Sequence, residues 1–200
     1  MKTRLSLLSL LAFVLLSFNI NAQDVDAQDF DGANCTSIMV GKDATTDGSV
    51  ITSHTCDGMY RTWLRWEKAQ EHEKGATQKI YRGSMHTRNA NEIKGLELAG
   101  EIPQAAYTYS YLNTAYPCLN EKQLAIGETT FSGPDTLVNP EGLFMIEDLE
   151  RIALQRCDNA RDAIRLIAEL IKEYGYGDGG ECITIADPNE VWCMEIMGEG

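Results

Sequence analysis

The order of secondary-structure signals constrains the fold more than any other feature of this 200-residue sequence. Residues 35–55 and 123–131 are β-rich and largely apolar, and a helical pattern covers 146–174. Residues 181–196 return to strand character around the turn Asp187-Pro188-Asn189-Glu190. Helices that are enclosed by strands on both sides in the sequence favour layers of helix packed on sheet. The sequence therefore predicts an α+β fold.

The helical segment is expected to contain two helices in series. Asp158-Asn159 interrupts it and supplies an N-cap for the second helix, and Gly175 provides a C-terminal stop. Apolar residues recur between these signals at helical spacing, which predicts one buried face. They are Ala160, Ala163, Ile164, Ile167, Leu170, Ile171 and Tyr174.

Two β-hairpins are predicted, one at each end of residues 35–200. The first joins 35–41 to 49–55 through the turn signal Asp47-Gly48, with Cys35 at its first position. The second pairs Thr184 with Cys193, which makes Cys182 a diagonal neighbour of Cys193 at about 7–8 Å. Because a disulfide usually needs less than about 7 Å, we expect these two cysteines to be unbonded.

The middle of the chain gives weaker signals. Residues 60–82 suggest further strands and a loop, and the tyrosine-rich stretch 107–116 fits either a helix or a strand. Residues 83–106 are poorly periodic and receive no assignment.

The first 34 residues differ in character from the remainder. Residues 1–22 have Lys2 and Arg4 before a short apolar run and end in a small residue, which predicts a secretory signal; an uncleaved membrane anchor is the alternative. Residues 23–34 are polar and acidic, which is typical of a flexible propeptide or of a leader without a role. Residues 35–200 are enough for one domain. The expected location is therefore periplasmic or secreted.

Charge and cysteine spacing exclude several classes of function. The net charge of −13, without a basic cluster, argues against binding to nucleic acid or to anionic membranes. The six cysteines form no CxxC pair, which argues against a zinc knuckle. In an exported chain they are candidates for disulfides, and Cys35 is in addition a candidate for chemistry.

Cys35 would acquire a base of its own if the preceding residues were removed. A free α-amine has a pKa of about 7.7–8.0 and a thiol one of about 8.5, so proton exchange between them is easy near neutral pH. While Asn34 is attached, that nitrogen is an amide and no base, so the precursor would be an inactive zymogen. A buried small apolar side chain or a disulfide partner is the alternative role of Cys35.

Several motifs resemble the bacterial dipeptidases of the N-terminal-nucleophile (Ntn) cysteine hydrolases, whose relatives include secernins, penicillin V acylases and bile salt hydrolases. The resemblance covers essentially all of residues 35–200, and the opening run is specific in combination with the GETTF element. The motifs are CTSIMVGK at 35–42, HTCD at 54–57, GETTF at 127–131 and IADPNEVW at 185–192.

The resemblance implies an αββα four-layer sandwich, of which this chain is the N-terminal portion, and hydrolysis of dipeptides or short peptides. It implies Cys35 as the nucleophile and Asp57 as a carboxylate beside its amine; a turn residue is the alternative for Asp57. Relatives place an arginine where this chain has His54. Either His54 replaces it as a pH-sensitive partner, or activation of the Cys35 thiol is weaker in this chain. A metal site from His54 and Cys56 is the least favoured reading.

The resemblance also assigns the oxyanion site. The element Glu128-Thr129-Thr130 would bring backbone N–H groups to it, with Thr130 the leading candidate; a strand end with an ordinary turn is the alternative. A second donor would come from a region after residue 200. Neither a metal nor a cofactor is implied. Rival functions are an acylase that cuts a non-peptide amide and an inactive exported binding protein. A homo-oligomer is compatible with all three, and no stable membrane association is expected after signal removal.

Overall fold

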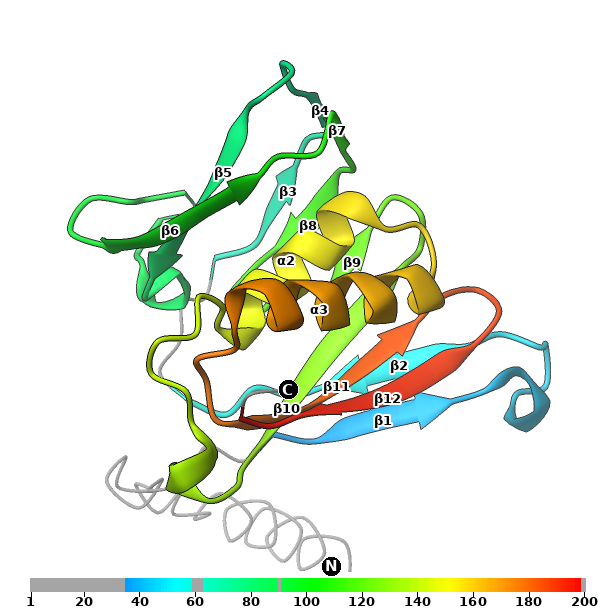
Figure 1. Cartoon of the computed structure of the whole chain (residues 1–200). Coiled ribbons are helices and arrows are strands. Elements are labelled where there is room, and N and C mark those ends of the chain that lie inside the picture. Colours follow the sequence, from blue (N-terminus) through cyan, green and yellow to red (C-terminus); the bar gives the residue numbers. More distant parts are fainter. Residues whose placement is uncertain (1–34, 59–62, 90, 199–200) are drawn as a thin grey trace, which may run out of the picture. The chain divides into compact units, whose positions relative to one another are not determined.

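The computed structural model describes residues 35–58, 63–89 and 91–198. The chain divides into two compact units, 1–32 and 33–200. The first lies outside the described residues, as do the predicted signal and propeptide. All of the described helices and strands belong to the second unit (Figure 1).

An antiparallel sheet with the order β12-β11-β10-β9-β8-β3 is the largest sheet among the described residues. Separate two-stranded ladders are formed by β1 with β2, β4 with β7 and β5 with β6. The strands of the large sheet are β3 (Arg65–Glu67), β8 (Tyr111–Asn113), β9 (Leu119–Asn120), β10 (Ala125–Ser132), β11 (Gly180–Ala186) and β12 (Val191–Ile196). The others are β1 (Ser37–Val40), β2 (Ile51–His54), β4 (Gln70–Glu71), β5 (Thr77–Arg82), β6 (Glu97–Pro103) and β7 (Tyr107–Thr108).

The helices α2 (Ile146–Arg156) and α3 (Ala160–Tyr174) cover one face of β10, β11 and β12, and the β1–β2 hairpin packs on the other face (Figure 1). The core lies between helices and sheet, where Ile126 and Ile183 from the sheet and Leu149 and Ile167 from the helices are 0–1% exposed. Burial of these branched side chains is the main force that holds the two layers together. None of the described helices is long and apolar enough to span a membrane.

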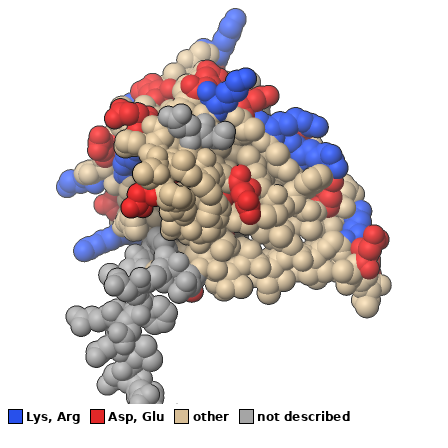
Figure 2. All heavy atoms as spheres, turned by 60° about the horizontal axis from the view of Figure 1, so that its bottom comes forward, with Lys and Arg blue, Asp and Glu red and all other residues tan. Residues whose placement is uncertain are grey.

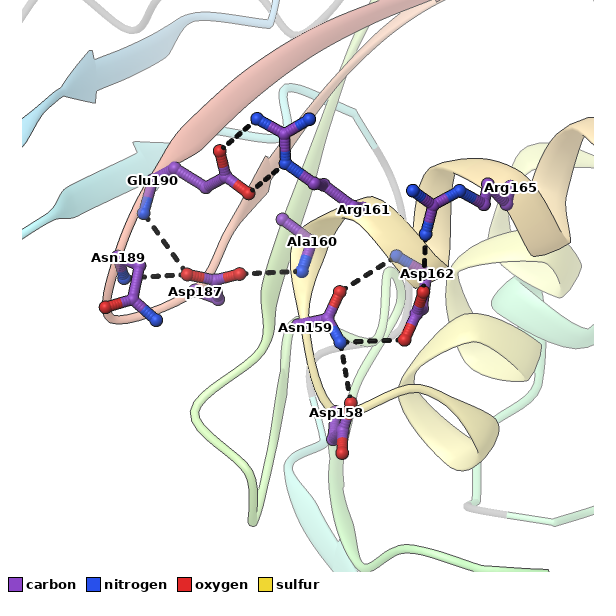
Figure 3. Close-up of polar contacts among 9 residues, drawn as sticks. All are labelled: Asp158, Asn159, Ala160, Arg161, Asp162, Arg165, Asp187, Asn189 and Glu190. Atoms are coloured by element: carbon purple, nitrogen blue, oxygen red, sulfur yellow. Dashed lines mark hydrogen bonds and ion pairs between the residues drawn. The ribbon is translucent and has the colours of Figure 1, made fainter.

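The N-terminus of α3 is tied to the β11–β12 turn (Figure 3). The side chain of Asn159 accepts a hydrogen bond from the N–H of Asp162 at 2.9 Å, which confirms the predicted N-cap. The carboxylate of Asp187 accepts from the N–H groups of Ala160 and Asn189, at 2.9 and 2.7 Å. One buried side chain therefore caps the helix and closes the turn.

Both hairpin predictions are confirmed in their pairing, with one correction. The connection in the first hairpin has ten residues, and a 3₁₀ turn at Lys42–Ala44 precedes the turn signal Asp47-Gly48, where Gly48 has a φ of 75°. Its first strand begins at Ser37, so Cys35 precedes the ladder by two residues. Of the alternatives for 107–116, the strand is right: β7 and β8 lie there.

In the second hairpin Thr184 pairs with Cys193, as predicted. Cys182 and Cys193 are not bonded to each other, as predicted. Their side chains nevertheless approach each other, with the Sγ atoms 3.1 Å apart. Both side chains lie on one face of the ladder, and the strand twist brings this diagonal pair together.

The outward face of the β1–β2 hairpin is apolar. Ile38 and Ile51 are 56% and 48% exposed there. Figure 2, which turns this side of the molecule forward, shows a broad area with few charged side chains.

Candidate active site

Cys35 is held beside β10 by the β1–β2 hairpin. Ser37, two residues later, shares a hydrogen bond with the Thr129 hydroxyl of β10. On the other hairpin strand, the hydroxyl of Thr52 donates to that of Thr184 at 3.1 Å. These cross-sheet contacts fix the hairpin over the sheet and leave the Cys35 side chain partly exposed at the edge of β10.

The edge of β10 next to Cys35 is open. Strand β9 pairs with β10 only through Ala125 and Leu119, and no other described strand continues along that side. Further along the same edge the backbone N–H of Thr130 points at the Cys35 sulfur, and the N–H of Asp57 does so from the segment after β2. An unpaired strand edge therefore directs a backbone donor at the thiol.

The Cys35 thiol also donates a hydrogen bond to the Oε1 atom of Glu128 at 3.5 Å. Burial raises the pKa of this thiol, and the Glu128 carboxylate raises it further. The two backbone N–H groups act in the opposite direction. In the uncleaved chain the net effect keeps the sulfur protonated, so a further positive charge or base is required for it to become a thiolate.

Glu128 belongs to a group of carboxyl side chains between β10, β11 and α2, which we call the acid cluster: Glu128, Glu147, Glu150 and Glu181. All are 0–3% exposed, and Tyr176, also fully buried, lies among them. Neither Glu150 oxygen has a hydrogen-bond partner within the described chain, and the same holds for the Tyr176 hydroxyl. Such an assembly is expensive to bury, so its members must share protons or meet a cation.

Burial determines the protonation of the acid cluster. It raises the pKa of Glu181 to about 9, and a hydrogen bond with Glu128 adds to the rise. Burial likewise raises the pKa of Glu147 to about 8 and that of Glu150 well above its usual range. Burial therefore favours the neutral form of these three carboxyl groups. Glu128 is the member of the cluster that contacts the thiol.

His54 lies against Gly127 of β10, where a Cβ atom would sit 2.4 Å from the His54 Nδ1 atom. Burial lowers the pKa of His54, and the Glu128 carboxylate opposes this only in part. The imidazole is thus neutral at pH 7 and is no substitute for a fixed cation such as arginine.

The structure brings the predicted residues together in altered roles. Asp57 is exposed and reaches Cys35 through its backbone N–H. Thr129 faces the hairpin, whereas Glu128 and Thr130 face the other side of β10. A carboxylate does not stabilise an oxyanion, so Glu128 could serve an oxyanion hole only through its backbone N–H.

Sequence reasoning missed Glu181 and Glu150 altogether. Glu181 is the second residue of a strand that has no other charged residue, and Glu150 lies among the buried residues of α2. A charged residue within an otherwise uncharged pattern is the signal that could have identified both residues from the sequence.

Cys56 is a poor nucleophile, because burial raises its pKa to about 12. The described residues also contain no group of three or more His, Cys, Asp or Glu side chains that could hold a metal ion.

Comparison with known proteins gives a consistent result. The family described as Peptidase family C69 matches residues 34–200. A probable dipeptidase of Latilactobacillus sakei is 27% identical over 177 residues, which are 82% of this chain and 35% of the relative. Probable dipeptidase B of Streptococcus pyogenes serotype M1 is 23% identical, and that of Lactococcus lactis subsp. lactis 26%, over 82% of this chain in each case. The chain spans 33–35% of the length of these relatives.

Proposed function

The chain belongs to peptidase family C69, and from this premise we propose that it forms the nucleophile-bearing part of a cysteine dipeptidase. The single observation that carries the proposal is the surroundings of Cys35. Its thiol lies at an open strand edge with backbone donors from Asp57 and Thr130 and a carboxylate from Glu128. A structural cysteine would need none of these groups.

The proposed mechanism begins with removal of residues 1–34. The free α-amine of Cys35 accepts the thiol proton, and the thiolate attacks the peptide carbonyl carbon. Negative charge develops on the carbonyl oxygen, where the Thr130 N–H is the donor we favour. The tetrahedral intermediate collapses as the leaving amine takes the proton, which leaves a thioester on Cys35. Water then attacks the thioester carbon and gives a proton to the α-amine. The C–S bond breaks, the acid is released, and the proton returns to the Cys35 sulfur.

This proposal includes the export route and the four-layer Ntn architecture. The apolar start of the sequence supports export, and processing at Cys35 would then follow translocation. The helix layer, the large sheet and the β1–β2 hairpin on its far face are compatible with three layers of such a sandwich.

The test compares cysteine variants of the processed protein. Cys35→Ala should lower dipeptide hydrolysis at least about 10³-fold, measured as release of free amino acids. Cys35→Ser should be severely slowed as well, because a hydroxyl is a far weaker acid than a thiol. Cys56→Ala is the matched control and should retain most activity, since the pKa of that thiol is too high for thiolate formation.

Mass spectrometry should find that active protein begins at Cys35. Full turnover by Cys35→Ala, or activity in a chain that retains Asn34, would refute the mechanism. Release of a non-peptide acid from an acyl amide, without action on dipeptides, would identify an acylase. A Cys35 that no thiol reagent labels would indicate an inactive binding protein.

A further inference from the structure

Glu128 meets the nucleophile without a basic partner among the described residues. Of the ion pairs between described residues, none involves Glu128, Glu150 or Glu181. The buried guanidinium of Arg151 is engaged by Asp148 at 2.6 Å. Glu181 shares a hydrogen bond with Glu128, and the Thr130 hydroxyl donates to the Glu128 Oε2 atom at 3.4 Å. The Oε1 atom remains directed at Cys35.

A carboxylate in this position opposes catalysis unless a cation joins it. It disfavours the thiolate and would repel a developing oxyanion. A positive group that arrives with the substrate reverses both effects, since it neutralises Glu128 at the moment of attack. The Glu128 side chain is 0% exposed, and an ion pair formed there is stronger than one in water.

Covalent geometry indicates that the α-ammonium of the substrate can reach Glu128. In an amino-terminal residue, the α-nitrogen lies about 2.5 Å from the carbonyl carbon of the same residue. A nucleophile poised for attack is about 3–3.5 Å from that carbon. The α-ammonium therefore comes within about 6 Å of Sγ. The Glu128 Oε1 atom lies 3.5 Å from the same sulfur, which is close enough for the two groups to meet. The partly exposed Cys35 side chain marks the approach to it.

We propose that the buried Glu128 side chain, whose Oε1 atom lies beside the Cys35 sulfur, is the site that binds the α-ammonium of the substrate. The site then selects peptides with a free amino terminus that are cut after their first residue. This inference rests on the proposed function and refines it, because an acyl group without an ammonium would leave the charge of Glu128 unpaired. Loss of such a charge-assisted contact corresponds to about 10- to 100-fold in rate.

The experiment uses thiol alkylation, so that it does not depend on turnover. The processed protein is treated with leucine chloromethyl ketone and, separately, with its N-acetyl derivative, and modification of Cys35 is followed by mass spectrometry. The wild type should react about 10- to 100-fold faster with the free-amino reagent. Glu128→Gln should reduce this ratio to near one. The control Glu195→Gln, at an exposed position on β12, should preserve it.

Other results overturn the inference. Equal rates with the two reagents in the wild type would exclude an ammonium site, even if dipeptides are hydrolysed. An unchanged ratio in Glu128→Gln, together with altered labelling by iodoacetamide, would assign Glu128 to the amine of Cys35 itself. Near-ultraviolet circular dichroism checks that the variant is folded. Hydrolysis of free and N-acetylated dipeptides is measured in parallel: selective alkylation without any hydrolysis would retain the ammonium site and reject the dipeptidase function.

Discussion

At the scale of single residues, Gly127 determines where His54 can lie. A methyl group there would be 2.4 Å from Nδ1 and 2.8 Å from Cγ of the imidazole. We expect Gly127→Ala to displace His54 and to lower the free energy of unfolding by about 1–3 kcal/mol. Urea denaturation measures this. Gly41→Ala is the control, because no atom lies within 4 Å of its added Cβ. Equal stability of the two variants would show that His54 is not confined by Gly127.

At the scale of elements, the β11–β12 hairpin brings two thiols into contact. The Sγ atoms of Cys182 and Cys193 are 3.1 Å apart, and a disulfide needs about 2.05 Å. We expect oxidised glutathione to join them by thiol–disulfide exchange and to raise the free energy of unfolding by about 2–3 kcal/mol. Mass spectrometry should show the loss of two hydrogens.

The hairpin prediction has two controls. Cys193→Ser should prevent both changes, and a reductant should reverse them in the wild type. If both thiols can still be alkylated after treatment with oxidised glutathione, the two cysteines do not form a disulfide and the prediction is wrong. Oxidation would be relevant in the periplasmic or secreted setting proposed above.

At the scale of the whole molecule, the acid cluster should make stability depend on pH. The folded pKa values of about 8 for Glu147 and about 9 for Glu181 lie above the ordinary value of 4.5. At pH values between the ordinary and the folded pKa, the folded state binds more protons than the unfolded state. The free energy of unfolding therefore decreases as pH rises through this range. We expect a loss of at least about 2 kcal/mol between pH 5 and pH 8.

Denaturation at a series of pH values tests this expectation. Glu181→Gln should flatten the dependence, because an amide mimics the protonated carboxyl at every pH. The exposed Glu169→Gln should leave the slope unchanged. A stability that rises from pH 5 to pH 8 would show that the cluster is ionised in the folded protein.

Local sequence patterns were enough to predict several elements of this fold. The periodicity of 160–174 defines α3, the side chain of Asn159 caps it, and the turn at 187–190 sets the register of Thr184 with Cys193. Each rests on neighbours in sequence, which interact through short-range geometry. The family resemblance is confirmed as well, since its motifs are read from the chain directly.

Only the tertiary structure decided how distant residues meet. The sequence singled out Cys35, His54, Asp57 and Glu128–Thr130, but not the packing of the hairpin over β10. That packing brings the Glu128 carboxyl group to a thiol 93 positions away, whereas α2 and β11 bring Glu150 and Glu181 to the same carboxyl group. Burial, which controls the protonation of these groups, depends on all the layers at once. A sequence pattern records which groups are present; their desolvation and mutual distances arise from the fold.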